Sequence, residues 1–209
     1  QICEALEVEK GGQISEYLSD LEETQYISRY QGWSLQSGKK IKNSLYRLKD
    51  NYIRFYLRYI EPYADAIGKG KIKTPPAWDA IMGLQFENLI VNHFKQIYSI
   101  LNVSPDQIVN DGPYIQRQTK SHLGCQIDYL LQLKYNSLYL CEIKYSSKPI
   151  DLAVVKEVQK KIEALHHPKM RFSVRPVLIH VNGVAEAVRE SGFFTHIIDF
   201  SQFLNKNSC

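Results

Sequence analysis

The sequence contains little that would hold a metal through sulfur or cross a membrane. Its four cysteines (Cys3, Cys125, Cys141 and Cys209) are scattered, and no pair has metal-ligand spacing or suggests a disulfide framework. The longest uncharged stretches run only about ten residues, roughly half of what a membrane-spanning helix needs. These absences argue against a thiolate metal site, a disulfide-bonded scaffold and a membrane partner. They favour a protein of the reducing cytoplasm.

The sequence also lacks a phosphate-binding loop for ATP. The closest string runs from Gly32 to Lys40, but five residues separate its glycines, and Lys40 stands where the motif needs Ser or Thr. We therefore expect no nucleotide site in this chain. The chain starts at Gln1 and continues with acidic residues, without the basic start and apolar middle of a signal peptide. We expect it to be a piece cut from a longer protein.

Length and composition limit the number of domains, and charge is distributed unevenly along the chain. The 209 residues, 44% hydrophobic and 23% charged, fit one globular domain or two. The net charge of +4 is uneven, because residues 1–30 hold two basic and seven acidic residues, whereas residues 63–209 hold 17 basic and 13 acidic ones. If nucleic acid is a partner, the second part is the better candidate surface.

The first part of the chain follows the outline of a winged helix. Residues 13–23 have helical apolar spacing, residues 26–30 alternate like a strand, and Gln31-Gly32 predicts a turn. A complete winged helix needs one more helix, before Gln1 or cut by it. Asp50 is a good N-cap for a helix that runs to Tyr63. We expect a partial winged-helix domain with a connecting helix at 1–68, a linker near 69–76 and a second domain at 77–209.

The second part predicts an α/β fold. A long amphipathic helix comes first, then strands with a period of two, then alternating helices and strands. This order predicts a mixed sheet flanked by helices. The predicted elements are a helix at 78–101, strands at 114–119, 126–133 and 138–145, a helix at 150–166, a strand at 174–181, a short helix at 185–190 and a strand at 196–200.

Charged residues stand inside two of these apolar strands, where a full charge is costly unless it is paired or bound. Glu142 and Lys144 are two apart and project from one face of a strand, and Asp128 lies on the neighbouring strand of the hairpin. The carboxylates suit Mg²⁺ or Mn²⁺, which would activate water for attack on a phosphodiester, while Lys144 would orient that water or stabilise negative charge. The alternative is an internal salt bridge with no catalytic role.

Two further residues are candidates for the same site. Glu87, beside the apolar stripe of the long helix, is predicted as a third carboxylate ligand, although a solvent-facing glutamate fits the pattern equally well. Gln159, one place from Val158 on a later helix, is a candidate contact or a plain surface residue.

The ordered set of these motifs resembles the PD-(D/E)xK nuclease fold of restriction endonucleases and, more narrowly, the carboxy-terminal part of archaeal-type AAA ATPases, the DUF234 family. Ile127 replaces the Pro of the motif name, and Gln126 stands where relatives often carry Glu. Neither change removes a residue of the set Glu87, Asp128, Glu142 and Lys144. The matching features are Lys49–Tyr56 with Glu61-Pro62, Gly83–Glu87, Ile127-Asp128 and Cys141–Lys144.

The resemblance implies a winged helix that joins an amino-terminal P-loop ATPase, absent from this chain, to a Mg²⁺- or Mn²⁺-dependent nuclease-like domain acting on DNA. The first alternative is a catalytically inactive module that binds DNA or protein and regulates the attached ATPase. The second is an assembly domain that makes contact through its acidic winged helix.

Basic residues outside the carboxylate set are candidates for contact with the DNA backbone. The first group, near the predicted wing, is Lys39, Lys40, Lys42, Arg47 and Lys49. The second, on the helix after the carboxylate strands, is Lys156 and Lys160, with Lys161. A solvated surface is the alternative for both groups. The helix at 13–23 has four acidic and no basic residues, so packing between domains suits it better than reading DNA.

Overall fold

The computed structural model describes residues 2–9, 11–72, 75, 77–119, 123–165 and 171–204, which divide into two compact units. The first comprises the described residues of 1–31 and 43–73, and the second those of 32–42 and 74–209. The expected domains, 1–68 and 77–209, differ from this division at residues 32–42, the tip of a hairpin. Part of the expected linker at 69–76 lies outside the described residues.

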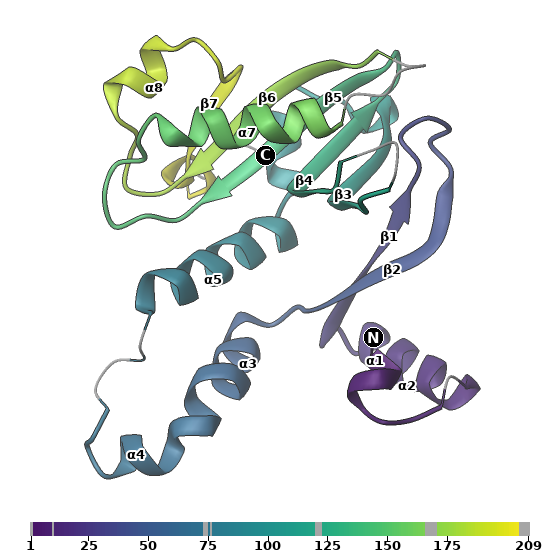
Figure 1. Cartoon of the computed structure of the whole chain (residues 1–209), viewed down its shortest axis with the longest axis vertical. Coiled ribbons are helices and arrows are strands. Elements are labelled where there is room, and N and C mark those ends of the chain that lie inside the picture. The colour runs from purple at the N-terminus through teal and green to yellow at the C-terminus, as the bar shows by residue number, and fades with distance from the viewer. Residues whose placement is uncertain are drawn as a thin grey trace. The chain divides into compact units, whose positions relative to one another are not determined.

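The first unit consists of short helices and the base of the hairpin (Figure 1). Gln31-Gly32, expected as a turn, lies inside β1 instead, and the chain turns between Ser34 and Lys39. Asp50 caps the next helix as expected, since its Oδ1 accepts a 2.7 Å hydrogen bond from the Ile53 amide. The elements are α1 (Ile2–Ala5), α2 (Gly12–Glu23), β1 (Ile27–Trp33), β2 (Lys40–Leu48), α3 (Asn51–Phe55), the π-helix η1 (Tyr56–Ile60), the 3₁₀ turn η2 (Glu61–Tyr63) and α4 (Ala64–Gly68).

The second unit is built on a five-stranded mixed sheet with strand order β3-β4-β5-β6-β7, within the described part of the chain. The first three strands pair antiparallel and the last three parallel, and helices flank the sheet (Figure 1). The expected α/β class with a mixed sheet is therefore confirmed. The elements are α5 (Trp78–Asn92), α6 (Lys95–Ile100), η3 (Pro105–Gln107), β3 (Ile108–Gln116), β4 (Cys125–Leu133), β5 (Ser137–Lys144), α7 (Ala153–Ala164), β6 (Ser173–His180), α8 (Glu186–Glu190), β7 (His196–Asp199) and η4 (Phe200–Phe203).

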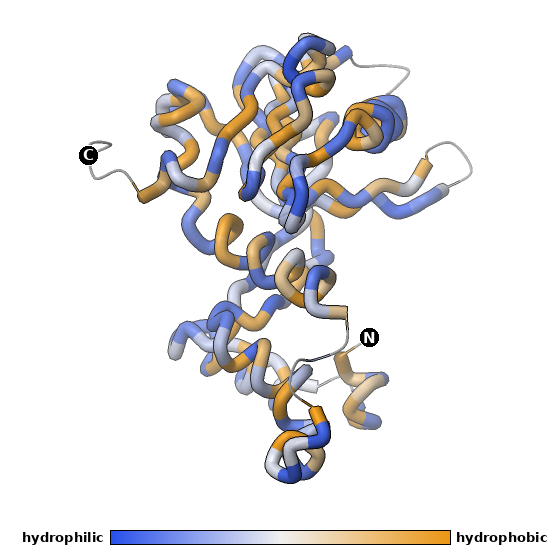
Figure 2. The backbone as a smooth tube through the Cα atoms, turned by 90° about the vertical axis from the view of Figure 1, so that its left-hand side faces the viewer, coloured by the Kyte–Doolittle hydropathy of each residue, from blue (hydrophilic) through white to orange (hydrophobic). Residues whose placement is uncertain are grey.

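Burial of the apolar strands and of one helix stripe forms the core of this unit. Leu130, Leu140 and Leu178 are fully buried and pack in one cluster with Val154 and Val158 of α7. Figure 2 shows hydrophobic stretches running through the strands of the sheet. Helix α7 is thereby held against the sheet face that carries Glu142 and Lys144, which positions the candidate site. No helix in the described ranges is long and apolar enough to span a membrane.

The hairpin tip belongs to the second unit because it is packed and hydrogen-bonded there. Trp33 and Leu35 are buried in the core cluster. The amide of Gln132 donates to the Leu35 carbonyl at 2.8 Å, and the amide of Asn110 donates to the Gly38 carbonyl at 2.8 Å. These buried side chains therefore fix the position of the turn against β3 and β4.

Replacing Gly38 by alanine should destabilise the second unit by about 1 to 2 kcal/mol, the cost of a left-handed conformation for a residue with a Cβ. Gly38 has a φ of +66°, and its Cβ would lie 3.2 Å from Cγ1 of Val109. Gly83→Ala is the matched control, since it adds a methyl group inside α5 where nothing lies within 4 Å. Urea unfolding should show a lower midpoint for Gly38→Ala and an unchanged or higher one for Gly83→Ala. Equal midpoints would contradict this account of the turn.

Candidate active site

Two carboxylates meet where β4 and β5 run side by side. Tyr129 pairs with Cys141 in the antiparallel register, so Asp128 and Glu142, one step further, project from the same face. The Oδ2 atom of Asp128 accepts a 2.9 Å hydrogen bond from the Ile143 amide, which fixes this carboxylate against β5. The Glu142 side chain is 3% exposed and that of Asp128 is 13% exposed. Two negative charges at this depth require a cation nearby.

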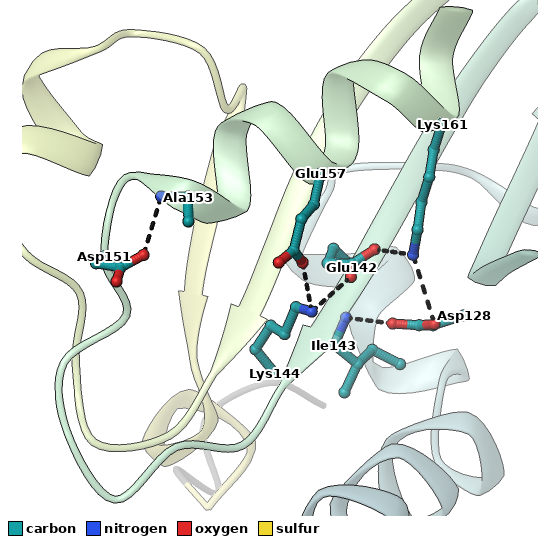
Figure 3. A network of polar contacts seen from close by, with 8 residues as sticks. All are labelled: Asp128, Glu142, Ile143, Lys144, Asp151, Ala153, Glu157 and Lys161. Atoms are coloured by element: carbon teal, nitrogen blue, oxygen red, sulfur yellow. Dashed lines mark hydrogen bonds and ion pairs between the residues drawn. The ribbon is translucent and has the colours of Figure 1, made fainter. Parts of the chain in front are cut away.

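Lys161 of α7 supplies that cation. Figure 3 shows its side chain extending from the helix toward both carboxylates. The Nζ atom lies 2.5 Å from Oε2 of Glu142 and 3.9 Å from Oδ1 of Asp128. The sequence predicts Lys161 as one of several surface lysines for DNA contact, but in the structure its ammonium pairs with Glu142 and lies near Asp128. The central feature of the site is one cation, the Lys161 ammonium, shared by two carboxylates.

Lys144 lies at the edge of the same cluster. Its Nζ is 3.2 Å from Oε1 of Glu142 and 2.8 Å from Oε2 of Glu157, and the Glu157 side chain is 54% exposed. Burial alone would lower the pKa of Lys144, but the carboxylates of Glu157 and Glu142 raise it above its ordinary value. Lys144 is therefore a protonated group, held between a buried and an exposed carboxylate (Figure 3).

The pKa of Asp128 reflects this crowding of negative charge. Burial and the neighbouring Glu142 carboxylate raise it to about 7. Lys161 and the Ile143 amide lower this pKa by smaller amounts, and the charge of Glu87 raises it slightly. An additional cation nearby would lower this pKa and favour the ionised carboxylate.

Glu87 is not placed in a compact ligand set with the other two carboxylates. It is half-buried on α5, and its charge acts on the pKa of Asp128. Among the described residues, no group of three or more His, Cys, Asp or Glu side chains could hold a metal together. Of the set predicted from the sequence, the structure therefore brings together Asp128, Glu142 and Lys144, and Glu87 does not complete a group of three carboxylates with them.

The other predicted contact residues lie on the surface. Gln159 is exposed and donates to Glu163 on the same helix, one turn along, at 3.3 Å, so it takes no part in the carboxylate cluster. Lys156 and Lys160 are exposed on α7. Lys39, Lys40 and Lys42 are exposed as well. Of these, Lys40 has its Nζ 5.2 Å from the centre of the Trp33 ring.

Two site residues were not predicted in their observed roles, Glu157 and Lys161. They stand four residues apart on α7, one helical turn, and both reach the strands beneath (Figure 3). Their spacing from the buried Val154 and Val158 is the signal that places them beside the sheet-facing stripe. The signal is difficult to recognise in the sequence, because several lysines and glutamates alternate along the helix.

No known protein family and no curated protein matches the chain. Among solved structures, the crystal structure of protein VC1899 from Vibrio cholerae is similar, with 13% sequence identity and a TM-score of 0.42. The similarity covers 95% of this chain and 44% of that one. The chain thus spans less than half the length of this structural neighbour.

The donor set suits a hard divalent cation. Mg²⁺ typically binds through one or two carboxylates and keeps waters or substrate phosphates as its other ligands. Asp128 and Glu142 supply two such carboxylates, and they already share one cation, the Lys161 ammonium. The residues present therefore fit Mg²⁺ or Mn²⁺ held by two protein carboxylates, in exchange for that ammonium.

Proposed function

We propose that the second unit is a PD-(D/E)xK nuclease-like domain that hydrolyses DNA phosphodiester bonds with Mg²⁺ or Mn²⁺. The observation that supports this most is the convergence of Asp128 and Glu142 on one cation-binding point. We propose further that the first unit is a partial winged helix, and that the chain acts as the carboxy-terminal part of an AAA-type ATPase.

Each residue has a defined part in this mechanism. Asp128 and Glu142 would hold the metal, which when bound polarises the phosphodiester and lowers the pKa of a bound water. Lys144, protonated between Glu142 and Glu157, would hold positive charge beside the reacting phosphate and stabilise the negative charge that develops there. Lys161, paired with Glu142, would compete with a metal for that carboxylate.

The Lys161 contact favours a second candidate function. A buried carboxylate pair that already shares a lysine ammonium can be an internal ion cluster with no metal. In that case the domain is a catalytically inactive module that binds DNA or protein and regulates the attached ATPase.

Incubation of the full chain with linear and branched DNA distinguishes the two. The nuclease proposal predicts cleavage with Mg²⁺ or Mn²⁺, none with EDTA, and none by Asp128→Asn. No cleavage under any condition, or equal cleavage by Asp128→Asn, would reject it in favour of the inactive module.

A further inference from the structure

The first unit contains a pocket of about 530 Å³ with three arginines in its wall. It lies between the end of β2 and the helical segment that follows. None of the described residues that line it is acidic. They are Tyr46, Arg47, Leu48, Arg54, Leu57 and Arg58.

The arginines of this pocket are placed to bind an anion strongly. Arg47 and Arg54 are half-buried, and Arg58 is exposed. A partly desolvated guanidinium offers several fixed N–H donors and pairs with phosphate oxygens two at a time. Arg47 and Arg54 also make contacts within the chain, so an anion would share these groups.

The surroundings of the pocket extend the positive charge. Arg29 of β1 donates from Nε to the Ser44 hydroxyl at 3.1 Å and lies 5.8 Å from the centre of the Tyr46 ring. Asp50 is the one acidic residue between positions 43 and 60, and its Oδ1 accepts the Ile53 amide as a helix cap. The basic residues over the same stretch are Arg47, Lys49, Arg54 and Arg58.

The pocket also differs sharply from the helix that a winged helix ordinarily uses for DNA. Helix α2 carries Glu16, Asp20, Glu22 and Glu23 and no basic residue, so phosphates would be repelled there. The arginine pocket is therefore the better phosphate-binding surface of this unit.

We propose that the arginine pocket binds phosphate groups of a nucleic-acid backbone and gives the first unit its own DNA contact. The choice of DNA as partner rests on the proposed function. Phosphate contacts of this kind carry no sequence information, so binding is independent of DNA sequence and weakens steeply with salt.

The test is fluorescence anisotropy of the full chain with labelled duplexes of unrelated sequence, in EDTA, over a range of salt. Arg54→Gln/Arg58→Gln should weaken binding at least tenfold for every sequence and lower the slope of log affinity against log salt by about 2. Lys69→Gln/Lys71→Gln removes the same charge elsewhere in the unit, where Lys69 pairs with Asp65 at 2.7 Å, and should change affinity less than twofold. Arg54→Lys/Arg58→Lys keeps the charge and should retain the salt slope.

Three results would overturn the proposal. They are equal affinity of Arg54→Gln/Arg58→Gln and wild type, equal weakening by Lys69→Gln/Lys71→Gln, and arginine-dependent binding of inorganic tripolyphosphate without DNA binding.

A thermal melt shows whether Arg54→Gln/Arg58→Gln is folded. If it is not, the affinity of Arg54→Lys/Arg58→Lys and the salt slope of wild type decide. Because EDTA prevents cleavage, arginine-dependent binding by a chain that never cleaves DNA would reject the nuclease and leave this inference standing.

Discussion

Replacing Glu142 by glutamine is expected to reduce metal-dependent DNA cleavage at least about a thousandfold. A bound metal supplies several kcal/mol of transition-state stabilisation, and each 1.36 kcal/mol is worth about tenfold in rate. Glu142 is the most buried carboxylate of the cluster, and both Lys161 and Lys144 contact it. Glutamine keeps the size of the side chain and removes the charge that holds the cation. Single-turnover cleavage with Mn²⁺ measures the loss.

Glu157→Gln is the matched control for this experiment. It removes a carboxylate that also contacts Lys144, at 2.8 Å, but that is exposed and lies outside the carboxylate pair. We expect less than about a tenfold effect, the lower range for a partner that only orients a site residue. Comparable losses in the two variants would show that Glu142 acts only through Lys144, and not as a ligand.

Replacing Lys161 by methionine should lower the free energy of unfolding by about 3 kcal/mol, the lower range for removing one partner of a buried ion pair. The side chain of Glu142 is 3% exposed and, within the described part of the chain, would keep Lys144, at 3.2 Å, as its ion-pair partner. Methionine preserves the aliphatic stem of Lys161, so the loss reports the ammonium. Urea unfolding in EDTA measures it.

The double variant Glu142→Gln/Lys161→Met separates charge from packing. Because Glu142 then carries no charge, only Asp128 loses a nearby cation, and it keeps its hydrogen bond from the Ile143 amide, so part of the stability lost in Lys161→Met should return. Saturating Mn²⁺ should also stabilise Lys161→Met more than wild type, since the metal then binds without competition. A double variant as unstable as the two single losses combined would show that Lys161 acts through packing alone.

The order of elements in the second unit was predictable because apolar runs and stripes dominate it. Val177, Leu178 and Ile179 are fully buried, and a continuous apolar run of this kind predicts a central strand. The break in the expected helix at 78–101 was missed because its apolar spacing continues across His93, where the backbone leaves the helical conformation. β3 begins at Ile108, earlier than expected. This start was missed because Asn110 is polar, and its burial depends on hydrogen bonds to the hairpin tip and to Gln132.

The strand part of the site was predictable, whereas the helix part was not. Charges inside apolar strands pointed to Asp128 and Glu142, and strand alternation placed Lys144 on the same face. Which lysine of α7 reaches the carboxylates depends on how the helix is rotated against the sheet, and that rotation follows from the packing of Val154 and Val158. The sequence alone leaves Lys156, Lys160 and Lys161 equivalent.

Binding of Mn²⁺ to the full chain, followed by electron paramagnetic resonance, tests most directly whether Asp128 and Glu142 form a divalent-cation site. We predict that wild type binds Mn²⁺, that Glu142→Gln does not, and that Lys161→Met binds it at least tenfold more tightly because the competing ammonium is gone. Absence of bound Mn²⁺ in both wild type and Lys161→Met, or binding unchanged by Glu142→Gln, would contradict the metal site and with it the proposed nuclease.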